Sequence, residues 1–429
     1  MATSAPRPNE EGRPSMRVGL LTQWYDPEPG PAALPGVLAR GLVARGHEVQ
    51  VLTGFPNYPS GVVAAGYRVQ RAMDEVVDGV RIRRVGLYPS HDASTVRRAA
   101  NYASFGLSAL VNGLSSLRGL DALWVNYSPV TVALPMWAAR YGLWIPQVVH
   151  VLDLWPDTVL AGGFARGGLA YRLAEAGLNR WCSGMYRSAA SVAYISPGVG
   201  PLLRERGVPA EKLHYVPMWA DEAVFRPVDD DMRAELGIDE GRIVLLYAGA
   251  LGDAQGLGTL IDACAKVTDD RLQCLIAGSG IAENALRAKA DRVGATNVRF
   301  LGRLPQNQMT RLMAAGDITY VGLRPHALSP FTMPSKTQAG LAAGRALLVA
   351  AEGDVAMVVE ESRAGFTADP GDPTSIAEAI QSACDLGRSG LRAMGVRARQ
   401  YYERNFSVGR GVASIEALLE QAAATRGKR

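Results

Sequence analysis

Residues 242–263, RIVLLYAGALGDAQGLGTLIDA, decide the fold. An apolar, β-branched run leads into a glycine-bearing loop, and the loop leads into a helix-like segment. A strand that passes through such a loop into a helix presents backbone N–H groups to a phosphate at the helix N-terminus. This stretch therefore predicts an α/β domain in which phosphate recognition is plausible.

The same alternation of strand and helix patterns runs along both halves of the chain. Because parallel strands are joined by crossover helices, each half predicts a doubly wound α/β domain. Ligands of such sheets bind beyond the carboxyl ends of the strands, and we expect the site in a cleft between two facing domains. Strand-like runs begin at Arg17, Glu48, Val80, Ala122, Pro146 and Ala190, and again at Arg242, Gln273, Asn297, Asp317 and Ala346.

The expected domain boundaries follow composition. Residues 1–15 contain little apolar sequence and predict a disordered leader. We expect an N-terminal domain over 16–220, joined by a C-terminal helix at 405–426, and a C-terminal domain over 221–404. The aspartates at 229–231 could hold a metal, but a solvated linker before a helix N-terminus is the favoured interpretation, because the helix dipole favours acids there.

Bulk composition indicates a soluble protein. Hydrophobic residues make up 48% and charged residues 20% of the chain. Because no secretory signal or long apolar run is present, we expect a cytoplasmic protein, with peripheral contact at the inner membrane face left open. The four cysteines lack CxxC spacing and indicate buried thiols. We expect no nucleic-acid partner, and oligomeric state is not indicated.

Residues 94–119, STVRRAANYASFGLSALVNGLSSLRG, combine arginines with apolar residues. Such a segment can press on an anionic membrane, or it can be a core helix. The core interpretation is favoured.

Neither glycine loop carries a dinucleotide-binding signature. GxGxxG with a following ribose-binding acid is absent, as is GxxxxGK[ST], so NAD-dependent and P-loop chemistry are disfavoured. Gly30 in the first loop and Gly249, Gly252 and Gly256 in the second are candidates for close approach to a phosphate. The alternative is that these glycines only permit tight turns.

Five segments, in order over nearly the whole chain, resemble family 4 of the retaining glycosyltransferases, particularly the branch that builds bacterial O-antigen and capsule polysaccharides. The resemblance implies a GT-B fold, with two Rossmann-like domains facing a central cleft, and transfer with retained anomeric configuration. It also implies that the N-terminal domain (16–220) binds the acceptor and that the C-terminal domain (221–404) binds the nucleotide sugar. It implies a nucleotide-diphosphate sugar, UDP or GDP, as substrate, a small-molecule or lipid-linked acceptor, and no separate cofactor. The matching segments are residues 22–61, 151–163, 195–227, 246–263 and 333–350.

Lys336 is the leading candidate cation. Glycosyl transfer gathers negative charge on the departing diphosphate, so the site needs cations or N–H dipoles there. Lys336 is one of only five lysines, and the resemblance places it at the donor diphosphate. Ser335 is expected to cap the following helix or to contact the donor. Because no His/Cys/Asp cluster has metal-ligand spacing, we expect metal independence.

The other expected donor contacts follow strands of the second half. Arg324 and His326 lie just after one strand, Arg303 lies after another, and an arginine fork suits a phosphate. Gln255 stands where many family members carry a lysine. Ala339 stands where many carry a ribose-binding glutamate.

In the first half, His150 and Asp153 lie at the end of a predicted strand and are candidate catalytic residues. Family members commonly place a histidine facing the sugar, and the spacing gives that position to Asp153, whose carboxylate could stabilise positive charge or bond a hydroxyl. The alternative for His150 is a core histidine. Tyr25, Trp155 and Asp157 are the expected acceptor contacts. Two other functions stay open: a nucleotide-sugar epimerase of the same fold, and a catalytically silent nucleotide-binding homologue.

Overall fold

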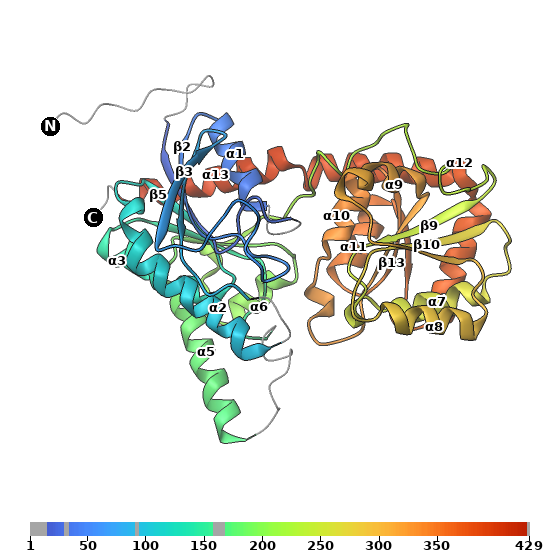
Figure 1. Cartoon of the computed structure of the whole chain (residues 1–429), viewed down its shortest axis with the longest axis horizontal. Helices are drawn as coiled ribbons and strands as arrows, with labels where there is room; N and C mark the ends of the chain where they lie inside the picture. The colour runs from blue at the N-terminus through green and yellow to red at the C-terminus, as the bar shows by residue number, and fades with distance from the viewer. Residues whose placement is uncertain (1–14, 30–33, 91–93, 158–167, 427–429) are drawn as a thin grey trace. The chain divides into compact units, whose positions relative to one another are not determined.

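The computed structural model describes residues 15–29, 34–90, 94–157 and 168–426. The chain divides into two α/β units (Figure 1). Unit 1 comprises Met1–Pro217 together with Val408–Arg429, and unit 2 comprises Met218–Ser407. The sequence placed these divisions at 220 and 404. Residues 1–14 of the expected leader lie outside the described residues.

Unit 1 is built on an eight-stranded sheet with the order β3-β4-β2-β1-β5-β6-β7-β8. Neighbouring strands are parallel except β3 with β4. The strands are β1 (Arg17–Leu21), β2 (Glu48–Gly54), β3 (Ala72–Val77), β4 (Val80–Val85), β5 (Ala122–Asn126), β6 (Gln147–Val151), β7 (Ser191–Tyr194) and β8 (Leu213–Tyr215). The helices are α1 (Leu34–Ala44), α2 (Thr95–Ser108), η2 (Ala109–Gly113), η3 (Leu114–Leu117), η4 (Val130–Val132), α3 (Ala133–Gly142), α5 (Leu169–Ser188), α6 (Val199–Glu205), η5 (Ala210–Lys212) and α13 (Val408–Ala424).

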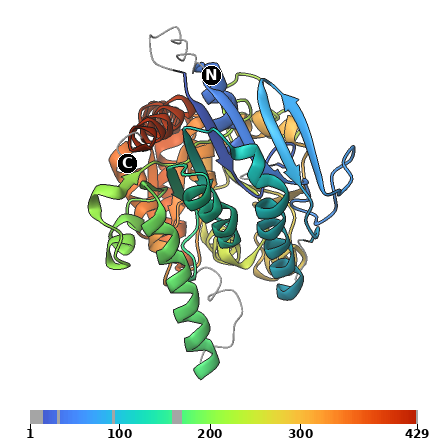
Figure 2. The ribbon, with the colours of Figure 1, turned by 90° about the vertical axis from the view of Figure 1, so that its left-hand side faces the viewer.

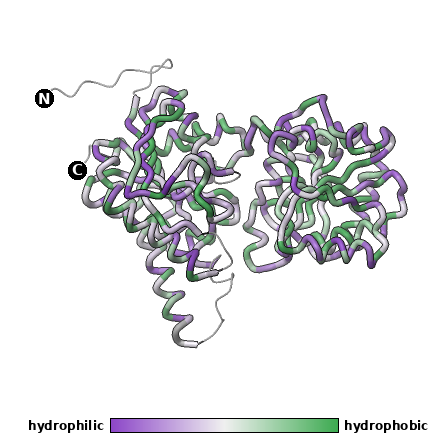
Figure 3. The backbone as a smooth tube through the Cα atoms, in the orientation of Figure 1, coloured by the Kyte–Doolittle hydropathy of each residue, from purple (hydrophilic) through white to green (hydrophobic). Residues whose placement is uncertain are grey.

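Unit 2 is built on a six-stranded parallel sheet with the order β11-β10-β9-β12-β13-β14. Apolar segments run through its centre (Figure 3). The strands are β9 (Ile243–Ala248), β10 (Leu272–Ala277), β11 (Val298–Gly302), β12 (Ile318–Gly322), β13 (Ala346–Ala350) and β14 (Gly365–Ala368). The helices are η6 (Asp253–Gln255), α7 (Leu257–Lys266), α8 (Glu283–Val293), η7 (Gln306–Gln308), α9 (Met309–Ala315), η8 (Ser329–Phe331), α10 (Ser335–Ala342), α11 (Asp354–Ser362) and α12 (Pro373–Asn405).

Each strand expected from the sequence is present within a residue of its predicted start, which confirms the doubly wound fold class. The pattern missed β3, β8 and β14, and all three are edge strands. An edge strand is paired on one side only and needs fewer apolar residues. The chain order reverses between β1 and β5 and between β9 and β12, so ligand sites are expected beyond the carboxyl ends of these strands.

Two local expectations change. The acidic linker precedes a turn rather than a helix: Asp230 pairs with Arg311, and Asp231 accepts a hydrogen bond from the Arg233 amide. Helix α2 buries Phe105 but also exposes apolar side chains, so it is a core helix on one face only. Helix α5 projects from the rest of unit 1 (Figure 2). Among the described residues, no helix has both the length and the apolar character needed to cross a membrane.

A buried ionic cluster ties α13 to the start of unit 1. The Met16 amide donates to His47 Nδ1, so His47 Nε2 carries the ring proton and donates to Glu416 Oε1 at 2.8 Å. Arg45 Nε donates to the other carboxylate oxygen of Glu416 at 2.6 Å. The Glu416 side chain is only 1% exposed, so its charge depends on these partners.

We expect Glu416→Gln to lower the free energy of unfolding by about 2 kcal/mol, because Arg45 and His47 lose a charged acceptor. Glu420→Gln in the same helix is the matched control and should change it by less than about 0.5 kcal/mol. Urea unfolding followed by tryptophan fluorescence measures the effect, since six of the seven tryptophans lie in unit 1. Equal effects of the two substitutions would contradict the ionic role of Glu416.

Candidate active site

The β9–α7 loop of unit 2 meets Lys336 at its first glycine. Gly249 has φ 150°, and a Cβ added there would lie 2.6 Å from Lys336 Cε and 2.8 Å from its Nζ. The Tyr247 ring centroid lies 5.0 Å from the same Nζ. Tyr247 Oη donates to the Ala250 carbonyl at 2.6 Å, which fixes the loop beside the amine. The φ of 150° favours glycine at 249, and a side chain there would also displace the flexible end of Lys336.

The Lys336 ammonium has no hydrogen-bond or ion-pair partner among the described residues. Protein atoms crowd the amine, although part of the side chain remains accessible. This burial lowers the pKa of Lys336. The buried Asp317 of the same unit is paired with Arg233 and Arg388, whereas the Lys336 amine has no carboxylate partner among the described residues and is available to an anionic ligand.

The loop glycines do not offer their amides as expected. The N–H of Gly249 donates to the Ala277 carbonyl, and the N–H of Gly256 donates to the Asp253 carbonyl. Gly252 donates to Gln255 Oε1 at 3.2 Å, so both members of that pair are used within the loop. Gly256, at φ 61°, permits the turn into α7. For these three amides, the tight-turn interpretation replaces direct phosphate binding.

Ser335 does not cap α10. The N-cap is Pro334, no side-chain cap hydrogen bond is present, and Ser335 is exposed. The reason is position: Ser335 is already the first helical residue, so its hydroxyl is one residue too late. The α10 N-terminus thus stays uncapped by side chains next to Lys336.

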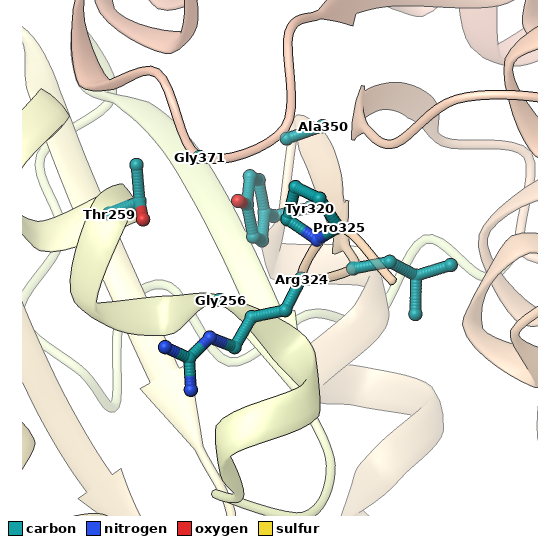
Figure 4. A pocket seen from close by; sticks show the side chains of 8 residues that line it. Gly256, Thr259, Tyr320, Arg324, Pro325, Ala350 and Gly371 are labelled. Atoms are coloured by element: carbon teal, nitrogen blue, oxygen red, sulfur yellow. The ribbon is translucent and has the colours of Figure 1, made fainter. Parts of the chain in front are cut away.

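A separate pocket of about 380 Å³ lies at the carboxyl ends of β12 and β13. Gly256, Thr259, Tyr320, Arg324 and Gly371 contribute to its lining (Figure 4). The structure therefore brings Gly256 and Arg324 together, at the opposite end of the β9–α7 loop from Lys336.

The remaining donor candidates are exposed. Arg324 Nη1 lies 3.5 Å from Asp253 Oδ2, and both side chains are largely in solvent. His326 Nδ1 accepts a hydrogen bond from the Leu328 amide, so the ring holds its own turn. Arg303 is exposed after β11. Ala339, which stands where many family members carry a glutamate, is buried in α10. No residue of α10 supplies a carboxylate in place of that glutamate.

In unit 1, Asp153 is accessible to solvent but crowded by protein atoms just after β6. Desolvation raises the pKa of its carboxyl, and a hydrogen bond with Ser128 partly offsets the rise. The Trp155 ring packs edge-to-face on Tyr102 with centroids 6.4 Å apart. Asp153 and Trp155 therefore stay candidates for substrate contact.

Of four further first-half predictions, two need correction, one stays a prediction and one falls outside the described residues. His150 is fully buried, and its Nε2 lies 3.0 Å from the Val216 carbonyl; burial lowers its pKa to about 4, so it is a neutral core histidine. Tyr25 is 3% exposed and packs inward, where burial raises its pKa. Asp157 is held by an ion pair with Arg206. Gly30 lies outside the described residues.

Sequence reasoning missed an aromatic cluster in unit 1. Trp24 contacts Tyr58 and Tyr102 edge-to-face, with centroids 6.3 and 6.2 Å apart. The aromatic residues after the first two strands, in TQWY and FPNY, were the available signal.

Two family descriptions match this chain. "Glycosyl transferase 4-like domain" matches residues 30–219, and "Glycosyl transferases group 1" matches residues 242–385. WcaI of Escherichia coli (strain K12) is named as a colanic acid biosynthesis glycosyl transferase. It is 27% identical to this chain over 345 residues, which cover 79% of this chain and 84% of WcaI. WbjE of Pseudomonas aeruginosa, named for a glycosyltransferase, is 25% identical over 313 residues, covering 72% and 77% of the two chains.

Solved structures share the fold. Sucrose-phosphate synthase from Thermosynechococcus elongatus has a TM-score of 0.71 at 18% identity, covering 96% of this chain and all (100%) of that chain. HepE of Anabaena in complex with UDP has a TM-score of 0.68 at 17% identity, covering 95% and 100% of the two chains.

We expect Lys336→Met to raise the melting temperature of the ligand-free protein by about 2–4 °C, because it removes a crowded, unpaired charge and keeps the aliphatic stem. Lys289→Met is the matched control, since Lys289 is paired with Asp262 on the surface of the same unit. Scanning calorimetry measures both. A lower melting temperature for Lys336→Met would show that the amine stabilises the fold.

Proposed function

This chain belongs to the glycosyltransferases that join a glycosyl transferase 4-like domain to a group 1 domain, and we propose that it transfers a sugar from a nucleoside-diphosphate donor with retention. Lys336 and the α10 N-terminus hold the leaving diphosphate, and no metal is required. The acceptor is a small or lipid-linked molecule.

The observation that carries this proposal is the unpaired amine of Lys336 against Gly249. Cleavage of the glycosyl–phosphate bond leaves negative charge on the diphosphate, and a preoriented cation stabilises that charge more strongly in a crowded site than in water. The first N–H groups of α10 add the positive end of a helix dipole beside it. A cation and helix amides together can replace the charge that a metal supplies in other transferases.

Asp153 is proposed to contact sugar hydroxyls or to stabilise positive charge on a sugar. Its carboxyl is accessible, and Ser128 orients it. A carboxylate accepts hydrogen bonds from hydroxyls in several directions, which suits a carbohydrate.

Polysaccharide assembly at an inner membrane face is the proposed setting. The name of WcaI refers to colanic acid biosynthesis. In this chain, α2 exposes Val96 (79%) and Leu107 (55%) beside exposed Arg97. An apolar surface next to a cation suits the headgroup region of an anionic membrane.

We expect Lys336→Met to lower kcat/KM for the donor at least tenfold, about 1.4 kcal/mol of transition-state stabilisation, while Lys289→Met leaves it unchanged. Nucleotide release from UDP-, GDP- and TDP-sugars, with and without acceptor and with EDTA, measures this. Full activity of Lys336→Met would remove Lys336 from the site. Loss of activity in EDTA would contradict metal independence, and isomerised donor without transfer would indicate an epimerase.

The lowered pKa of Lys336 predicts a pH dependence of nucleotide binding. Only the ammonium attracts the diphosphate, so affinity for UDP or GDP falls as pH rises through a pKa below the ordinary lysine value of 10.5. Lys336→Arg keeps a permanent charge and should shift this fall to higher pH. Calorimetric titration between about pH 7.5 and 10 measures both proteins. Identical pH profiles would contradict a role for Lys336 ionisation.

A further inference from the structure

A pocket of about 470 Å³ lies in unit 1 at the amino end of β6, and two distant parts of the chain line it. One part is the end of α3 with the segment that leads into β6, and the other follows α13. We call this hollow the α3–α13 pocket. Its lining residues are Arg140, Trp144, Pro146, Thr425 and Arg426.

Trp144 stands at a helix end where glycine is the usual residue. Beyond α3 the Ile145 amide donates to the Ala139 carbonyl at 3.1 Å, and Trp144 lies in the turn with φ 59°. Left-handed backbone favours glycine there, because a Cβ is strained. The indole is 60% exposed, and no aromatic ring or cation lies over it among the residues that the structure describes. A strained backbone that holds an uncovered indole indicates a ligand that stacks on the ring.

Two arginine side chains present hydrogen-bond donors at the same pocket. Arg140 Nε donates to the Ser188 carbonyl at 3.3 Å, and Arg426 Nη1 donates to the Leu120 carbonyl. Each contact anchors one edge of a guanidinium and leaves its other N–H groups without a hydrogen-bond partner in the described part of the chain. Asp121 Oδ1 lies 4.0 Å from Arg426 Nη1, whereas Arg140 has no carboxylate partner among the described residues. Anchored guanidinium forks with unused donors suit a phosphate.

A nucleotide is the ligand whose chemistry uses both features. A nucleobase stacks on an indole, and phosphate oxygens accept hydrogen bonds from guanidinium groups. Inorganic phosphate and sugar phosphates leave the indole unused, because they carry no planar ring. A membrane surface is flat, whereas these groups line a hollow whose volume falls within the range of roughly 300–1,000 Å³ that is typical of small-molecule sites.

We propose that the α3–α13 pocket binds a nucleotide, with the base against Trp144 and the phosphate at Arg140 and Arg426. The site is separate from the proposed donor site, because Lys336 belongs to unit 2. It is also separate from Asp153, since the five residues of β6 span about 16 Å between the pocket and that carboxylate. The protein thus has a second nucleotide site, whose occupancy does not depend on sugar transfer.

Fluorine NMR of the full chain labelled with 5-fluorotryptophan tests the site. The chain has seven tryptophans, and the Trp144 signal is the one that Trp144→Phe removes. The ligands are AMP, GMP, CMP and UMP, with ribose 5-phosphate, inorganic phosphate and phosphatidylglycerol vesicles as comparisons. We expect at least one nucleotide to shift the Trp144 signal saturably, with a Kd at least fivefold below that of ribose 5-phosphate.

Arginine variants test the phosphate contacts. Arg140→Gln and Arg426→Gln should each raise the nucleotide Kd at least fivefold. Because Arg426 follows the last helix, its substitution tests the pocket even if Arg140→Gln unfolds the protein. Arg204→Gln is the matched control, since Arg204 is an exposed arginine of α6 in the same unit, and it should keep the wild-type Kd. Lys336→Met should leave the Trp144 titration unchanged, whatever its effect on nucleotide release.

Several results would overturn this site. They are no saturable shift of the Trp144 signal with any nucleotide, an equal Kd for ribose 5-phosphate, a wild-type Kd in Arg426→Gln, an equal loss in Arg204→Gln, or loss of the shift in Lys336→Met. A shift with the vesicles alone would indicate a membrane contact instead. No sugar transfer occurs in this experiment, so failure of the second site and failure of the transferase proposal are separate results.

Discussion

Parallel pairing at the centre of each sheet, β1 with β5 and β9 with β12, is the interaction on which the remaining structure depends. Strands that run the same way release their next loops at the same sheet edge, and the reversal of chain order makes those loops diverge. In unit 2 the divergence of these loops leaves room for Lys336 to approach Gly249 closely. In unit 1 the loops after β1, β2 and β6 carry Trp24, Tyr58 and Trp155, respectively. Both groups of candidate residues therefore follow from strand direction.

Structural and functional residues of this protein differ in whether their crowded charges have an oppositely charged partner. Arg84, 1% exposed, is paired with Glu75 and also donates to backbone carbonyls. Glu416 is paired with Arg45 and accepts a hydrogen bond from His47, so removal of its carboxylate would take a charged partner from Arg45. Lys336 lacks any such partner among the described residues. The Tyr247 ring, 5.0 Å from Lys336 Nζ, offsets only part of the cost of desolvating this charge, and an anionic ligand would supply the opposite charge.

Burial explains why two residues that the sequence predicts at the site, His150 and Tyr25, are core residues instead. Both faces of a parallel sheet are covered by helices, so a polar residue inside a central strand points into the core whichever way it faces; this is the position of His150 in β6. Tyr25 is predicted to contact the acceptor, but its side chain is buried. Its amide donates to the buried Glu28 carboxylate, which also binds the amides of Asn57 and Tyr58 and folds the loop inward. No pattern in the sequence reveals such a long-range carboxylate.

The sequence by itself determined the two series of parallel strands and the glycine loop after the restarted strand, because period and loop composition are local properties. The pattern missed three edge strands, β3, β8 and β14, since an edge strand needs little apolar character. Only the tertiary structure decided which polar groups are paired and which aromatic rings meet. Trp24 and Trp155 lie far apart in sequence, and they join one chain of contacts through Tyr102 because β1, α2 and β6 end near the same sheet edge. Contacts between distant segments depend on how crossovers return to the sheet, and local sequence carries no record of that geometry.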